Sequence, residues 1–183
     1  MPCSISKGYA LNCKDTIGGI QAVFMTTDDL GALTIGTDDE VTAIGGTSID
    51  VYKYELKGAN GLETAVTSSN EAGTTFFEST LTLQLPKLTK SEQKELKLLA
   101  YTRPRIFVQT RNNDVLLMGE KYGVELTAGN ISSGQNMADF NGISLTFTAQ
   151  EALAPRFVEL SGATEADPFA GETDITVTEG TNS

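Results

Sequence analysis

The sequence has no histidine and no tryptophan among its 183 residues, and it has only two cysteines. The missing histidine removes the commonest general base and the commonest metal ligand in proteins. A structural zinc site needs four ligands, of which Cys3 and Cys13 could supply only two. We therefore predict a protein that is not an enzyme, with no catalytic residues, no cofactor and no bound metal.

Positive charge and long apolar runs are also scarce. Thirteen basic residues stand against 24 acidic ones, a formal net charge of −11. Proteins that read nucleic-acid sequence are normally basic, so that class is disfavoured, although an acidic surface can line a passage that DNA crosses without sticking. No apolar run is long enough to span a membrane, and Met1–Ser4 lacks a signal-peptide pattern, so we expect no membrane anchor and synthesis in a cytoplasm. Two reduced thiols are the default there, with a disulfide as the alternative.

Glycine and β-forming residues are plentiful instead. The chain has 18 glycines, which favour turns, and many threonines, which favour strands over helices. Its length suggests one domain that can bury a core without disulfides or metals. The fold class we predict is mainly β: an antiparallel β-sandwich or partial barrel with one flanking α-helix.

Residues 76–118 carry the clearest secondary-structure signals, and this stretch is predicted to begin with a long strand. Alternate residues point one way, namely Phe77, Ser79, Leu81, Leu83 and Leu85, and the polar residues between them point the other way. Pro86 removes a backbone donor and ends this strand. Two short β-rich runs at 106–110 and 115–118 follow later. The loop 111–114 between them has the composition of a hairpin turn.

The predicted helix lies inside this stretch, over about residues 89–101. Thr89 and Glu92 match the capping box that marks a helix start, and Pro104 disfavours helix in the residue before it. Leu96 and Leu99 share one face of this helix, so we expect that face to dock on the flank of a sheet.

Further strands are predicted at 20–25, 41–44, 49–57, 62–67, 122–128, 143–150 and 156–160. The turn 58–61 contains Asn-Gly, which readily adopts positive φ, so 62–67 is expected to return as the hairpin partner of 49–57. Residues 68–75 are expected to be a polar loop, and residues 129–141 a long one of a length that is usually functional.

The chain is predicted to divide at residue 160. Residues 1–160 form one domain with an N-terminal extended segment, and residues 161–183 form an acidic tail. Within the tail, residues 175–178 are predicted to be a weak strand that would pair only if a neighbour offers an edge.

Two acidic clusters, Asp28-Asp29 and Asp38-Asp39-Glu40, hold the densest carboxylates. Hard cations take clustered oxygen ligands, but the spacing of a calcium-binding EF-hand loop is absent. Solvated acidic loops are the more common meaning of such runs.

Several strings in the chain together resemble the virion proteins of tailed bacteriophages, and within those the tail tube (major tail) proteins. The strings are residues 13–20, 81–88, 105–109, 115–119, 122–125 and 139–147, and the resemblance extends over about residues 5–160. The family is similar in fold to the tube proteins of type VI secretion and other contractile injection systems. A tail terminator, a head–tail connector or a capsid-decorating β-sandwich protein would share these features.

The resemblance implies a function and a set of contacts. Members of the family assemble as hexameric rings that stack into a conduit for DNA, through an N-terminal segment and an extended loop. Its implied partners are further copies of itself, other virion proteins and genomic DNA that passes without specific binding, all in the virion tail. The candidate ring-stacking segments are residues 4–19 and the loop 129–141, and the candidate contacts in the loop are Asn130, Ser132, Gln135, Asn136 and Met137. The candidate charges of a DNA-repelling lumen are Glu78, Glu120 and Glu125.

Overall fold

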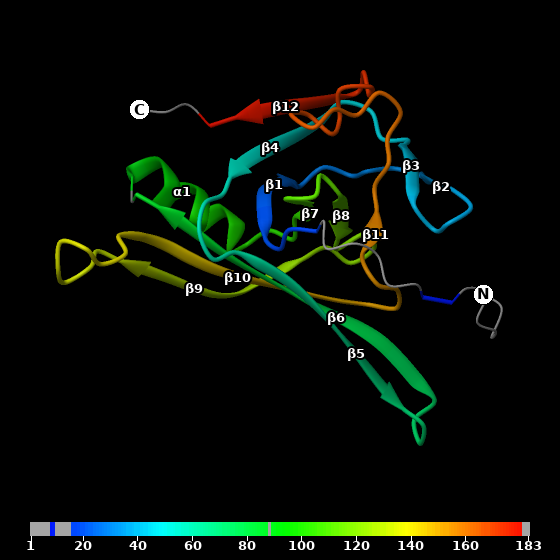
Figure 1. Ribbon diagram of the computed structural model, residues 1–183, viewed down its shortest axis with the longest axis horizontal. Helices are drawn as coiled ribbons and strands as arrows, with labels where there is room; N and C mark the ends of the chain where they lie inside the picture. The colour runs from blue at the N-terminus through cyan, green and yellow to red at the C-terminus, as the bar shows by residue number, and fades with distance from the viewer. Residues whose placement is uncertain (1–7, 10–15, 88, 181–183) are drawn as a thin grey trace.

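The computed structural model describes residues 8–9, 16–87 and 89–180. Two β-sheets face each other, and a third, two-stranded sheet lies beside them (Figure 1). The large sheet has the order β11-β8-β7-β1-β4-β12 and contains β1 Ile20–Thr26, β4 Ile49–Glu55, β7 Arg105–Thr110, β8 Val115–Met118, β11 Arg156–Phe157 and β12 Ile175–Glu179. The four-stranded sheet has the order β5-β6-β10-β9 and contains β5 Gly61–Ser69, β6 Thr74–Pro86, β9 Glu125–Ser132 and β10 Gly142–Glu151.

The small sheet pairs β2 Leu33–Ile35 with β3 Val41–Ile44, and the helix among the described residues is α1 Lys90–Leu99. The protein is thus mainly β, a sandwich with one flanking helix, which confirms the predicted fold class. It also confirms the strand over 143–150 and the hairpin of β7 and β8, whose turn is closed by the Thr110 amide donating to the Asp114 carbonyl at 2.8 Å.

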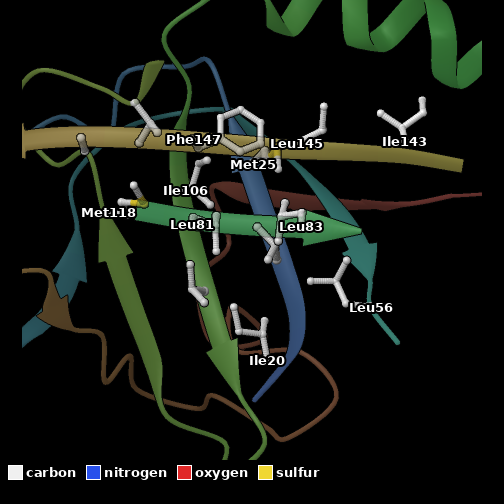
Figure 2. Close-up of a cluster of buried hydrophobic side chains, with 14 residues drawn as sticks. Ile20, Met25, Leu56, Leu81, Leu83, Ile106, Met118, Ile143, Leu145 and Phe147 are labelled. Atoms are coloured by element: carbon white, nitrogen blue, oxygen red, sulfur yellow. The ribbon is translucent and has the colours of Figure 1, made fainter. Parts of the chain in front are cut away.

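One hydrophobic core fills the space between the two sheets. Figure 2 shows Leu81 and Leu83 of β6 and Ile143, Leu145 and Phe147 of β10 gathered around side chains of the large sheet. Each alternating strand buries one face in this core, as the period of two requires. Burial of this kind supplies most of the driving force for folding.

A second core covers the opposite face of the large sheet. Phe24 and Phe107, from neighbouring strands, pack edge-on against Phe169, with ring centroids 5.4 and 4.9 Å away. The central strand β1 is therefore buried on both faces, which explains why its residues 22–25 are a continuous apolar run rather than an alternating one.

The helix α1 begins directly after Thr89, whose carbonyl accepts a hydrogen bond from the Gln93 amide at 3.2 Å. The Glu92 side chain of the predicted capping box falls outside what the structure describes. Leu96 and Leu99 pack against the core between the sheets, as the apolar face of the helix predicts. The helix therefore lies on the flank of the sandwich.

The predicted hairpin between 49–57 and 62–67 is wrong. β4 belongs to the large sheet, whereas β5 pairs with β6 over nine residues in the four-stranded sheet. Asn60 lies at the crossing between the sheets: its Nδ2 donates to the Lys57 carbonyl and its Oδ1 accepts from the Gln84 amide at 2.7 Å. A local turn signal carries no information about a longer partner strand, so the sequence pattern missed this crossover.

The weak strand predicted after residue 160 has its partner within its own chain, where β4 offers the edge. β12 runs parallel to β4, and the Lys53 ammonium donates to Glu179 at 2.8 Å, which raises the pKa of Lys53. Phe169 is only 1% exposed in the second core. Phe169, together with Ile175 and Val177 that pack against the same core, draws residues 161–179 of this acidic segment onto the sandwich.

Candidate assembly surface

The four-stranded sheet presents a polar outer face, the face turned away from the large sheet. Because Leu81, Leu83, Leu145 and Phe147 point inward, the residues between them point outward. On the two central strands these are Glu78, Thr80, Thr82 and Gln84, with Ser144, Thr146, Thr148 and Gln150. None of the four strands contains a lysine or an arginine. This outer face, called the wall below, is thus rich in threonine and serine, and the charged residues of its strands are glutamates.

The strand register brings three glutamates into two adjacent rows of this wall. Glu63, Thr80, Thr148 and Glu125 form one row, and Glu78 lies in the next row opposite Gln150. The Gln150 amide donates to Glu78 at 2.6 Å. Hydroxyl groups cross-link the same face, since Thr127 contacts the Thr148 hydroxyl at 3.1 Å.

The three predicted lumen charges have different surroundings. Glu78 has no basic partner among the described residues, whereas Glu125 forms an ion pair with Arg103 at 2.5 Å. Glu120 follows β8 of the large sheet and accepts two hydrogen bonds from Arg156, at 2.6 and 2.7 Å. Its charge is therefore compensated, and it does not belong to the outer face described above.

The outer strands of this sheet, β5 and β9, are its two edges. Each offers a row of backbone donors and acceptors that no other described strand of the chain uses. β5 is exposed over most of its length, including Val66 on the side that would otherwise face the core. An exposed edge of this length is a template for pairing with another chain.

The β5–β6 hairpin continues beyond the sandwich as an arm, defined here as residues 65–77 (Figure 1). Residues 68 and 69 and residues 74 and 75, which the sequence pattern assigned to a polar loop, are strand instead. Ser68 and Thr75 are paired through their hydroxyls at 3.0 Å. The sequence reasoning missed this arm and Glu63, because residues 67–75 are mostly polar and do not alternate.

The candidate stacking residues fall into two groups. Asn130 and Ser132 belong to β9, opposite Ser144 and Gly142, so the predicted loop begins later than expected, at residue 133. The reason is that β10 is long enough to extend the pairing up to Ser132. Gln135, Asn136 and Met137 lie in the remaining turn, the hairpin tip, defined here as residues 133–141.

The hairpin tip is ordered by a single carboxylate. Asp139 Oδ2 accepts hydrogen bonds from the Asn136 amide at 2.7 Å and the Gln135 amide at 2.9 Å. These two backbone bonds lower the pKa of Asp139. Gly134 adopts a φ of 72°, a conformation that favours glycine, and a Cβ at this position would lie 3.1 Å from the Asp139 Cβ.

Carboxylates of the two acidic clusters form hydrogen bonds and ion pairs with other residues of the same chain. Asp28 accepts the Asp50 amide at 2.8 Å, and Asp29 lies 3.4 Å from Arg105. Asp39 pairs with Arg156 at 3.1 Å. Among the described residues, no group of three or more carboxylate, cysteine or histidine side chains is arranged to hold a metal ion.

The N-terminal candidate segment, residues 4–19, lies largely outside the described residues, as do Cys3 and Cys13. In the part of the chain that the structure covers, no helix is long and apolar enough to cross a membrane. The fold and the surface together define a β-sandwich protein with two unpaired edges on a polar, acidic sheet.

No protein-family model and no curated protein matches this sequence. A chain in a solved structure, the virion of a native gene transfer agent particle, is similar to this chain at 12% identity. The similarity extends over 81% of this chain and 98% of that chain, with a TM-score of 0.35. At that score the likeness carries no weight for fold or function.

Proposed function

We propose that this protein is a virion structural protein without catalytic activity, the subunit of a phage tail tube. Its copies form rings, hexameric by the family resemblance, that stack into a conduit for DNA. The observation that carries this proposal is the four-stranded sheet, which has two edges that no other described strand pairs with and whose four strands contain no basic residue. The sequence resemblance described above supports the same function.

The strand directions in that sheet suit head-to-tail association. Neighbouring strands are all antiparallel, so the two edge strands β5 and β9 run in opposite directions. β9 of one copy can therefore pair antiparallel with β5 of the next copy while every copy keeps the same orientation. Repetition of such a heterologous contact closes into a ring when the rotation per copy divides a full turn.

The outer face of the sheet suits a DNA conduit. In a closed ring the four strands of each copy line a continuous wall, and this wall carries Glu63 and Glu78 without a lysine or arginine. Phosphate groups find no ion-pairing partner on such a wall, so DNA meets repulsion rather than specific binding. The arm and the hairpin tip extend from the same sheet and are placed to contact the next ring or neighbouring virion proteins.

Negative-stain electron microscopy of the purified full-length protein tests this proposal. We expect rings and stacked tubes with an open channel. Single rings that never stack would favour a tail terminator or connector, and monomers or trimers would favour a decoration protein. Either of these results would contradict the tube assignment.

Replacing the hairpin tip separates ring formation from stacking. Exchange of residues 133–138 for a short glycine-containing turn removes Gln135, Asn136 and Met137 but keeps the pairing of β9 with β10. We expect a folded protein that forms fewer or shorter tubes. Tubes of normal length would show that the tip has no role in stacking.

A further inference from the structure

Met137 is an apolar knob at the apex of the hairpin tip. A turn over residues 136–139, closed by the Asp139 amide donating to the Asn136 carbonyl at 3.1 Å, places Met137 at its first corner. Met137 is 109% exposed, more than a residue in an extended chain. Asp139 and Gly134 hold the surrounding backbone, as described above. The side chain is thus presented to solvent from an ordered support.

An apolar cavity of about 120 Å³ opens beneath α1. Its lining residues come from β4, β6, β10 and the helix: Tyr54, Leu85, Glu95, Leu96, Leu99, Ile143 and Leu145. Burial raises the pKa of the Tyr54 hydroxyl, with a smaller contribution from the Glu95 carboxylate. The cavity lining is therefore largely apolar, with Tyr54 and Glu95 as its polar members.

The knob and the cavity match in size and chemistry. A cavity of roughly 150 Å³ lined by aliphatic side chains accommodates a molecule as large as benzene, so 120 Å³ suits one thioether side chain. Methionine is unbranched and polarizable, which lets it fill irregular apolar spaces. Interface energy concentrates in such anchors when they enter well-packed pockets.

Charge complementarity favours the same contact. The hairpin from 125 to 151 contains three carboxylates and no lysine or arginine. The segment 87–97 around α1 contains four of the thirteen basic residues and two acidic ones, Glu92 and Glu95. Lys90, Lys94 and Lys97 lie on one helical face, exposed, at spacings where like charges repel. An acidic hairpin from another copy would relieve that repulsion.

We propose that Met137 of one copy inserts into the cavity beneath α1 of a neighbouring copy. The inference rests on the proposed assembly of identical subunits and specifies one of its contacts. Knob and cavity lie on different parts of the surface, so the contact is heterologous and propagates from copy to copy. Figure 1 shows the hairpin tip at the far end of the four-stranded sheet, past α1, where it can reach another molecule.

Thiol cross-linking tests the contact directly. In a chain with Cys3→Ser and Cys13→Ser, the double variant Met137→Cys with Leu99→Cys should form disulfides between chains once particles assemble. The matched control pairs Met137→Cys with Phe157→Cys, whose β11 position lies at an edge strand of the large sheet, away from the cavity. We expect a ladder of linked chains on a non-reducing gel for the first pair and single chains for the control.

Two variants test the same contact without cysteine chemistry. Met137→Ala should raise the protein concentration at half-assembly on the order of tenfold, which corresponds to a loss of about 1.4 kcal/mol of contact energy from a truncated anchor. Met137→Leu should assemble nearly as well as the unaltered protein. Leu99→Trp, which fills the cavity from its rim, should match Met137→Ala in assembly while the isolated subunit keeps its circular dichroism spectrum.

The outcomes separate this inference from the proposed function. Tubes that form without cross-links, with Met137→Ala assembling normally, overturn the knob contact and leave the tube intact. A disulfide within one chain also overturns it. A full-length protein that stays monomeric in sedimentation at high concentration overturns both.

Discussion

At the scale of single residues, the order of the hairpin tip depends on one carboxylate. Asp139 holds the backbone of the hairpin tip through the amides of Gln135 and Asn136, and these bonds favour its charged form. The folded-state pKa of Asp139 lies below the ordinary value of 3.8. Its contribution to tip order is therefore complete above that pH and is lost as the pH falls through the lowered value.

The first prediction follows for Asp139. Acidification below the ordinary carboxyl pKa should release the Gln135 and Asn136 amides and leave the sandwich folded. Amide chemical shifts measured by nuclear magnetic resonance would titrate together, with a midpoint below 3.8. In Asp139→Asn these shifts should show no such midpoint. A midpoint at or above the ordinary value would contradict the hydrogen bonding described here.

At the scale of elements, the C-terminal segment and α1 are each held by a small number of apolar contacts. Phe169 inserts between Phe24 and Phe107, and Leu96 and Leu99 attach the helix to the core between the sheets. Neither element has a long apolar sequence. Their positions are thus sensitive to single substitutions.

The second prediction concerns Phe169. Phe169→Ala should lower the free energy of unfolding by about 3–5 kcal/mol, because it leaves a cavity beside two aromatic rings. Phe157→Ala is the matched control: its ring is 50% exposed, so the loss should be about 1 kcal/mol or less. Chemical denaturation measures both values. Equal losses in the two variants would mean that Phe169 does not anchor the segment.

The third prediction concerns α1. Leu96→Ala should cost about 2 kcal/mol, the lower end of the range for core leucines, because Leu96 is only half-buried. Leu98→Ala, on the same helix but 50% exposed, should cost under about 1 kcal/mol. The comparison by denaturation keeps helix propensity constant. A larger loss for Leu98 would place the other face of the helix against the sandwich.

At the scale of the whole molecule, basic residues are distributed unevenly. The four strands of the four-stranded sheet contain none, while the segment 87–97 has four. The proposed rings would place chains of net charge −11 side by side, and the basic helix segment is well suited to an interface with acidic surfaces in such an assembly. The polar wall is suited to repel DNA.

The fourth prediction tests that wall. Glu63→Lys with Glu78→Lys should make assembled particles bind double-stranded DNA in a salt-dependent manner, since lysines on the wall pair with phosphates and release counter-ions. The control reverses two exposed glutamates of the C-terminal segment, Glu159 and Glu165, by the same charge. Retention of DNA by assembled particles is the measurement. Equal binding by both variants would show that the outer face does not line the channel.

The amino-acid sequence by itself determined the elements whose signals are local. Alternation made β6 and β10 recognisable, a start signal and two leucines marked α1, and an asparagine-rich turn joined β7 to β8. The same local patterns placed Glu78 on the polar face of its strand. Such features depend on neighbours within a few positions, so a single sequence contains them.

Only the tertiary structure decided which strands pair. β5 pairs with β6 rather than with β4, and β12 pairs along the edge of β4. β9 extends to Ser132 because β10 is long enough to pair with it there. The cavity beneath α1 exists only where helix, β4 and two strands of the other sheet meet. Which strands pair depends on the relative free energies of alternative contacts between distant residues, such as the burial of Phe169 between two rings. A local sequence pattern does not contain that information.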